Sequence, residues 1–227
     1  MDGTLTPPGL IDFPHLRSSI RSIASTDPNN ANNQLNLDED ALILASQLSP
    51  SGRSKCSLVL KSVEDKVLQE MSLSPGVVEV MRYCCVSGLR AAVVTRNIER
   101  VASRLSSLIG VYRSDSTAVL DPLIARNSLD PLTGLAVPPK PSPAALLSVC
   151  GSWGLRPADV LMVGDSWEDD VQAAGRAGCR SVLIDTGVDN STGGRRSDLG
   201  EGRMYEPDWT VREFKDVMGV LVDNAPP

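Results

Sequence analysis

Two hydrophobic patterns divide the chain near residue 74. Before that point, apolar residues recur every three or four positions, as in IDFPHLRSSIRSIAS and SLVLKSVEDKVLQEMSL. This spacing is typical of amphipathic helices. An asparagine-rich segment, TDPNNANNQLNLD, interrupts the pattern and has no periodicity, so we expect a loop or a disordered insertion there. The region therefore predicts a small helical domain.

After residue 74, short apolar runs alternate with helical segments. The runs RAAVVT, DVLMVGDS and RSVLIDTG are uninterrupted and do not alternate with polar residues. Such strands are buried on both faces, as in a parallel sheet that is covered by helices. The segment DWTVREFKDVMGVL predicts a further strand followed by a helix. The pattern therefore predicts an α/β fold with a doubly wound parallel sheet.

The same patterns predict the domain boundaries. Residues 1–7 and 74–227 are expected to form the α/β core, and residues 8–73 an inserted helical domain. Within the core, residues 188–207 are rich in glycine and poor in apolar residues, which predicts a flexible loop.

Composition and charge narrow the classes of partner. The formal net charge is −6 at pH 7, and lysine and arginine are not clustered, so we expect no nucleic-acid partner. No apolar stretch approaches the roughly 20 residues of a membrane span, so we expect no membrane partner. Five cysteines without a CxxC pair favour reduced, buried thiols and an intracellular location. A small-molecule substrate is the remaining class.

Polar residues follow the predicted strands at the edge where doubly wound sheets bind their ligands. Thr95 follows AAVV, Asp165 follows VLMVG, and Asp169 stands four residues further on. Asp2 lies in the opening turn, and Lys140 lies in a proline-rich turn before a helix. Carboxylates suit Mg²⁺, whereas a lysine and a hydroxyl can hold phosphoryl oxygens. The set therefore predicts a site for Mg²⁺ and a phosphate.

Each of these residues also has a purely structural interpretation. Asp2 can stand in an ordinary turn, Thr95 can cap a helix, and Lys140 can be a solvated side chain. Asp165 and Asp169 can be a turn residue and a first-turn acid that interacts favourably with the helix dipole. What favours the functional interpretation is that all of them occur together and in this order.

The segments DGTLT, AAVVTRN, KPSP and VGDSWEDD stand in the order and approximate spacing of four motifs of the haloacid dehalogenase-like (HAD) hydrolases. The chain resembles this family over nearly its whole length, and resembles its plant and algal phosphatase-like members in particular. The resemblance implies a Rossmann-like core with a helical cap. It also implies Mg²⁺-dependent hydrolysis of a small phosphorylated metabolite through an aspartyl-phosphate intermediate.

The resemblance also assigns roles to residues. Asp2 corresponds to the general acid and base, and Lys140 to the catalytic lysine. The Mg²⁺ ligands correspond to Asp2, through its backbone carbonyl, Asp165 and Asp169. The phosphate-binding groups correspond to Gly3, Thr95, Arg96, Asn97 and Lys140. Glu168 and Asp170 are expected to face solvent or to lie behind these ligands.

The first motif of this family places a nucleophilic aspartate two residues before the position of Asp2, at the end of a buried strand. In this sequence Met1 occupies the spacer position. We therefore expect that the methionine inside the motif was taken as the start, and that the nucleophile and the first core strand are missing. The chain as printed is accordingly expected to be inactive. The location, cytoplasm or plastid, stays open.

Two other functions fit the same residues. A phosphomutase can share all four motifs, and a non-catalytic pseudo-phosphatase would bind phosphate without turnover. A dehalogenase is disfavoured, because that branch lacks the acid to which Asp2 corresponds and does not need Mg²⁺. The sequence predicts neither the substrate nor the oligomeric state.

Overall fold

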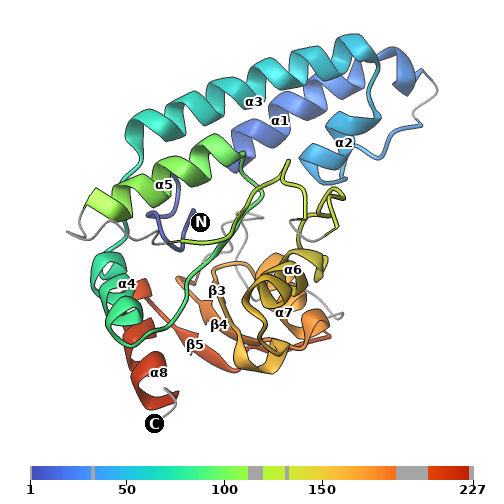
Figure 1. The fold of residues 1–227 in the computed structure, drawn as a ribbon. Coiled ribbons are helices and arrows are strands. Elements are labelled where there is room, and N and C mark those ends of the chain that lie inside the picture. The colour runs from blue at the N-terminus through green and yellow to red at the C-terminus, as the bar shows by residue number, and fades with distance from the viewer. Residues whose placement is uncertain (1, 32–33, 112–119, 131–132, 188–203, 225–227) are drawn as a thin grey trace. The chain divides into compact units, whose positions relative to one another are not determined.

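The computed structural model describes residues 2–31, 34–111, 120–130, 133–187 and 204–224, which divide into two compact units. One unit comprises Met1–Gly9 and Met71–Pro227, and the other Leu10–Glu70 (Figure 1). Most of the loop predicted at residues 188–207 lies outside the described residues. Its last four residues, 204–207, are in neither a helix nor a strand.

The smaller unit is helical, as the apolar spacing predicts. It contains α1 (Phe13–Ser25), α2 (Ala41–Gln47) and α3 (Pro50–Glu70), with a single 3₁₀ turn at Pro28–Asn30. The residues buried between these helices are Leu16, Ile20, Ala24, Leu44, Ala45, Leu48 and Cys56. The apolar face of each helix therefore supplies the core of this unit.

The asparagine-rich segment is more ordered than the sequence predicts. Its Asp27 is buried and accepts hydrogen bonds from Ser49 N at 3.0 Å, Ser49 Oγ at 2.8 Å and Asn29 N at 2.9 Å. Ser49 directly precedes α3, and its Oγ accepts a hydrogen bond from Gly52 N at 3.1 Å. One carboxylate thus joins the segment after α1 to the first turn of α3, and of the two expected alternatives, a loop and a disordered insertion, the described residues of the segment have the loop.

The strands of the larger unit are parallel, which confirms the α/β fold class. Within the described residues, β1 (Val93–Val94) pairs with β2 (Leu123–Ile124) in one sheet. β3 (Leu161–Gly164), β4 (Arg180–Ile184) and β5 (Trp209–Val211) form a second sheet in that order. β2 was not predicted from the sequence, because a run of two residues is too short to show a strand pattern.

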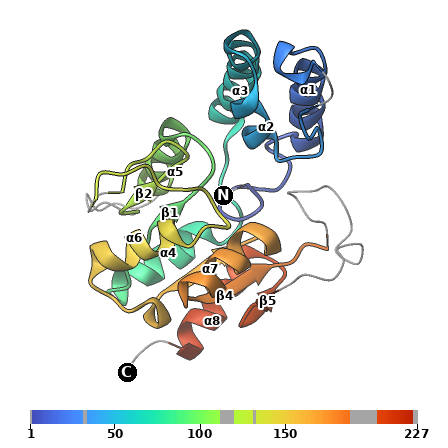
Figure 2. The same cartoon turned by 90° about the vertical axis from the view of Figure 1, so that its right-hand side faces the viewer.

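Helices cover both faces of these sheets. α6 (Ala144–Trp153) and α7 (Gln172–Ala177) lie on one side, and α4 (Val77–Val86) and α8 (Val217–Asn224) on the other (Figures 1 and 2). α5 (Glu99–Val111) contacts β2. The residues buried where α6 and α7 meet β3 are Leu146, Cys150, Val160, Ala173, Ala174, Ala177 and Cys179.

The helix predicted over EDDVQAAGRAGC forms only in part. The chain leaves β3 through a single π-helical turn, Trp167–Val171, and only then enters α7. The turn is capped by Ser166, whose side chain accepts a hydrogen bond from Asp169 N. A π turn widens the helix by one residue, and such turns are frequent at functional sites.

Four of the five cysteines, Cys56, Cys84, Cys150 and Cys179, are buried and Cys85 is exposed, in line with the expected mostly buried thiols. Among the helices of the described residues, none is both long enough and apolar enough to cross a membrane.

Replacing Gly52 with alanine should destabilise the helical unit, although alanine is the better helix former. A Cβ at Gly52 would lie 2.0 Å from Asp27 Oδ2 and 2.9 Å from Leu48 Cβ. Moving Asp27 would break its bonds to Ser49, so we expect a loss of about 1–3 kcal/mol in the free energy of unfolding. Urea unfolding of the full chain measures this change.

In the control Gly219→Ala, nothing lies within 4 Å of the new Cβ, and a gain of up to about 1 kcal/mol in the free energy of unfolding is expected. An unchanged stability for Gly52→Ala would contradict the prediction.

The helical unit should lose stability in acid through Asp27. Burial acts to raise the pKa of Asp27, but hydrogen bonds from Ser49 and Asn29 outweigh it and hold that pKa below its ordinary value. The carboxylate therefore stabilises the folded unit above the unfolded-state pKa, and this contribution disappears as the pH falls through the lowered folded-state value.

Hydrogen exchange of the α1–α3 amides, corrected for the intrinsic effect of pH, measures this loss between about pH 6 and pH 2. Asp27→Asn should be less stable than the wild type at neutral pH and should respond less to acid. Asp38→Asn, which changes a carboxylate whose side chain is 91% exposed, should behave like the wild type. Equal acid responses of the Asp27→Asn chain and the wild type would overturn the assignment to Asp27.

Candidate active site

The residues singled out in the sequence gather at the carboxyl ends of β1 and β3. Thr95 directly follows β1, and Asp165 directly follows β3. The turn after β3 carries four carboxylates, those of Asp165, Glu168, Asp169 and Asp170. The three aspartates each contact a different part of the larger unit, so this turn is the centre of the site.

The opening turn of the chain reaches this centre. Asp2 is buried and forms an isolated parallel bridge with Thr6. Gly3 has a φ of 76°, a conformation that glycine adopts without strain. Thr4 Oγ1 donates a hydrogen bond of 2.8 Å to Asp165 Oδ1. Thr4 was not among the predicted site residues. Its position inside DGTLT is the one feature of the sequence that indicates it.

Arg96 and Asp169 make the second contact, with 3.2 Å between Arg96 Nη1 and Asp169 Oδ2. Burial raises the pKa of Asp169 above its ordinary value, although the positive charges of Arg96 and Lys140 act to lower it. The Arg96 side chain is thus engaged with a carboxylate, so a phosphate contact of this residue would use its backbone N–H. Glu168, one residue before Asp169, is exposed, as expected.

Lys140 and Asp170 form a buried ion pair, with side chains 8% and 5% exposed. Burial acts to lower the pKa of Lys140, but the Asp170 carboxylate outweighs it and raises that pKa. Burial acts in turn to raise the pKa of Asp170, which the Lys140 charge nevertheless holds low. Ser166 N donates a hydrogen bond of 3.1 Å to Asp170 Oδ2. Asp170 is therefore buried against Lys140 rather than facing solvent, in line with the second of the two placements expected for it.

Gly164 makes room for this ion pair. It is the last residue of β3, and a Cβ at this position would lie 2.1 Å from Asp170 Oδ2. Only a glycine lets the strand pass so close to the carboxylate. The sequence contains this glycine inside VLMVGDS, but nothing in the pattern connects it with a residue six positions further on.

Thr95 also has a structural contact. It is buried, and its Oγ1 accepts a hydrogen bond of 3.1 Å from Asn97 N, as a capping threonine does. That bond uses a lone pair of the hydroxyl oxygen, so the O–H proton stays available as a donor. The capping interpretation and the phosphate interpretation are therefore compatible for this residue.

The donor set fits Mg²⁺. Asp165 and Asp169 offer carboxylate oxygens in the turn after β3, and the backbone carbonyl of Asp2 is the third ligand that the resemblance implies. Among the described residues, no three histidine, cysteine, aspartate or glutamate side chains form a metal-binding group. Mg²⁺ usually binds one or two carboxylates and keeps several waters, so it does not need such a cage.

Removing the charge of Lys140 should destabilise the larger unit strongly. Lys140→Met leaves Asp170 buried without its cation, and such losses cost about 3–5 kcal/mol. The double variant Lys140→Met with Asp170→Asn should recover part of that loss, because no buried charge is then left unpaired. Urea unfolding of the full chain measures both changes.

The control Lys61→Met removes an exposed ion pair with Asp65 and should lower the free energy of unfolding by no more than about 0.5 kcal/mol. Equal losses for Lys140→Met and Lys61→Met would contradict the importance of burial.

Comparisons with known proteins agree with this geometry. Residues 137–217, which include Lys140, Asp165 and Asp169, match a family model described as HAD-hydrolase-like. Over 99% of its length the chain is 25% identical to a haloacid dehalogenase-like hydrolase domain-containing protein of Arabidopsis thaliana, of which it covers 82%. Over half of its length it is 32% identical to the phosphoglycolate phosphatase of Pasteurella multocida. It covers only half of that enzyme.

Solved structures share the fold. A hydrolase from Pseudomonas syringae superposes with a TM-score of 0.63 at 16% identity, covering 99% of this chain and 96% of that one. A predicted phosphoglycolate phosphatase from Haemophilus somnus superposes with a TM-score of 0.59 at 23% identity, covering 92% and 91%. By sequence the chain is thus similar to the haloacid dehalogenase-like hydrolases, whose family model matches residues 137–217, and it shares the fold of these solved structures.

Proposed function

We propose that this protein acts as a Mg²⁺-dependent phosphatase on a small phosphorylated metabolite. The observation that carries the proposal is the turn after β3, whose three aspartates contact Thr4, Arg96 and Lys140. Hydroxyl, cationic and carboxylate groups thereby converge at the carboxyl ends of parallel strands, where this class of fold binds its ligands. The phosphoglycolate phosphatases among the relatives support a phosphate monoester as the substrate.

In this proposal the chain's own residues hold and orient the phosphate. Lys140 keeps its positive charge, because Asp170 raises its pKa, and so it can attract phosphoryl oxygens. Asp165 and Asp169 would hold Mg²⁺, which neutralises phosphoryl charge when it is bound. Asp2 would give a proton to the leaving group and later take one from water.

The aspartyl-phosphate route needs a second carboxylate beside Asp2, two positions earlier. The resemblance assigns that carboxylate the role of nucleophile. The proposal predicts that the chain binds Mg²⁺ and phosphate. The helical unit, α1–α3, is assigned the role of a cap that excludes water during the reaction.

Titration calorimetry with Mg²⁺ and inorganic phosphate tests the binding site. We expect phosphate to bind more tightly when Mg²⁺ is present, because the metal charge offsets the carboxylates. Asp165→Asn should weaken Mg²⁺ binding at least about tenfold, since one of two carboxylate ligands is lost. The control Asp223→Asn changes an exposed carboxylate in α8 and should leave binding unchanged.

A folded chain that binds neither Mg²⁺ nor phosphate would overturn the proposal. Equal weakening by Asp165→Asn and Asp223→Asn would show that Mg²⁺ binds elsewhere. In a hydrolysis assay, 2-phosphoglycolate is the first substrate to try, because several relatives carry that name.

A further inference from the structure

The backbone carbonyl of Tyr205 accepts hydrogen bonds from two side chains at the two ends of the π turn after β3. Trp167 Nε1 donates to Tyr205 O at 3.1 Å, and Gln172 Nε2 donates to the same oxygen at 3.1 Å. Both donor residues are buried. A buried N–H that loses its acceptor costs free energy, so this carbonyl stabilises both side chains where they are.

The π turn explains how two residues five positions apart reach one oxygen atom. Val171 N donates to Ser166 O at 3.3 Å, which is the five-residue hydrogen bond of a π turn. Residues that are five apart in such a turn lie on the same side of it, as Trp167 and Gln172 do. An α-helix has 3.6 residues per turn, so the same two residues would lie about 140° apart around its axis. The shared acceptor therefore favours the π turn over an α turn.

Tyr205 is itself anchored on two sides. Its ring lies against α7 at Gly175, where an added Cβ would be 2.1 Å from Tyr205 Cγ. It also packs against a cluster of buried apolar residues, Trp167, Val171 and Leu183. Three residues further on, Asp208 N donates to Ser181 O of β4 at 3.0 Å, and Ser181 N donates to Asp208 Oδ2 at 2.8 Å. The carbonyl thus belongs to a segment that is fixed to both α7 and β4.

The π turn carries one of the two proposed Mg²⁺-binding carboxylates. Asp165 directly follows β3, whereas Asp169 stands inside the π turn. The strand therefore positions the first carboxylate, and the turn positions the second. If the turn were wound as an α turn, the Asp169 side chain would leave the helix axis in another direction.

We propose that Tyr205 is a positioning residue of the Mg²⁺ site. Its carbonyl holds the π turn and thereby determines where Asp169 lies relative to Asp165. This inference rests on the proposed function, because it concerns the same metal ligands. Tyr205 acts through the turn and does not itself contact Mg²⁺. Removing a group that orients a metal ligand in this way typically weakens metal binding about 10–100-fold.

Mg²⁺ titration calorimetry of the full chain, with variants that lack the donors, tests this proposal. Trp167→Phe removes the indole N–H and keeps an aromatic ring. Gln172→Met removes the amide and keeps a side chain of similar length that is also a good helix former. The matched control is Trp153→Phe, because Trp153 Nε1 at the end of α6 also donates to a backbone carbonyl, that of Asp121, at 2.9 Å.

The double variant Trp167→Phe with Gln172→Met should weaken Mg²⁺ binding at least about tenfold. Trp153→Phe should leave the Mg²⁺ Kd as in the wild type. Both chains lose an indole donor to a carbonyl and should be less stable, so the Mg²⁺ Kd separates positioning from a merely structural role. Equal Mg²⁺ affinity of the double variant and the wild type, or equal weakening by Trp153→Phe, would overturn the proposal.

Gly175→Ala reaches the same carbonyl from the side of Tyr205 and leaves both donors in place. The new Cβ would displace the Tyr205 ring, so Mg²⁺ binding should again weaken about tenfold. Gly219→Ala, whose new Cβ has nothing within 4 Å, should leave it unchanged. If the double variant does not fold, Gly175→Ala decides in its place: weaker binding supports the proposal, and unchanged binding overturns it.

Hydrogen exchange reports on the turn without Mg²⁺. The amides of Val171 and Gln172 should exchange at least about tenfold faster in the double variant, because the hydrogen bonds that limit opening of the turn are lost. The amide of Val182 in β4 should change less. A wild-type chain that binds no Mg²⁺ would overturn the proposed function, whereas faster exchange would still support Tyr205 as the group that positions the turn. Unchanged exchange in the folded double variant would overturn the role of Tyr205 whether or not Mg²⁺ binds.

Discussion

The buried ion pair of Lys140 and Asp170 is the interaction on which the rest of the site depends. Both charges are removed from water, so each needs the other, and breaking such a pair typically costs about 3–5 kcal/mol. The pair anchors the start of the α6 region to the turn after β3. Because that same turn carries Asp165 and Asp169, its position determines where the other two carboxylates meet Thr4 and Arg96.

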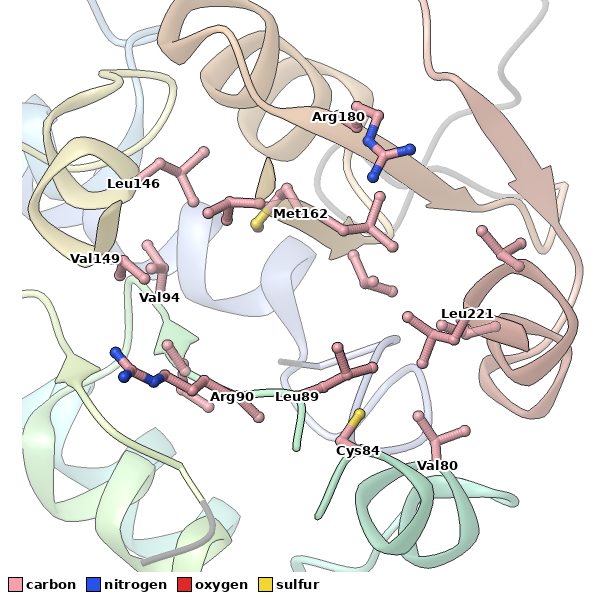
Figure 3. Close-up of a pocket in the computed structure, with 18 of the residues that line it drawn as sticks. Val80, Cys84, Leu89, Arg90, Val94, Leu146, Val149, Met162, Arg180 and Leu221 are labelled. Carbon is pink, nitrogen blue, oxygen red and sulfur yellow. The ribbon is translucent and has the colours of Figure 1, made fainter. Parts of the chain in front are cut away.

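A largely apolar cavity lies between the two sheets of the larger unit. Val94 of β1, Met162 of β3 and Leu146 and Val149 of α6 line it (Figure 3). The core helices pack around it, and α6 contributes Leu146 to one apolar cluster and Val149 to another.

The helical unit owes its order to a different kind of contact. The exposed pairs along α3, Lys61 with Asp65 and Lys66 with Glu70, contribute little, because solvent screens them. The buried carboxylate of Asp27 contributes more, since it satisfies backbone and hydroxyl donors at the start of α3. In both units, a buried aspartate joins two segments that are distant in the sequence: Asp27 bonds to Ser49, and Asp170 to Lys140.

The sequence by itself determined the fold class, because uninterrupted apolar runs can only be strands buried on both faces, and such strands require a parallel sheet covered by helices. It also identified the segments that form the site, since polar residues directly follow those runs. Only the tertiary structure decided which buried polar side chains contact one another. From the sequence, Asp170 could face solvent or lie behind the ligands, and only the structure shows that it is buried against Lys140, which is thirty positions away in the chain. The burial of Asp27, which lies in a polar segment, could not be predicted for the same reason. Hydrophobic periodicity indicates which face of an element is buried, whereas a buried polar contact depends on which distant residues the fold brings together.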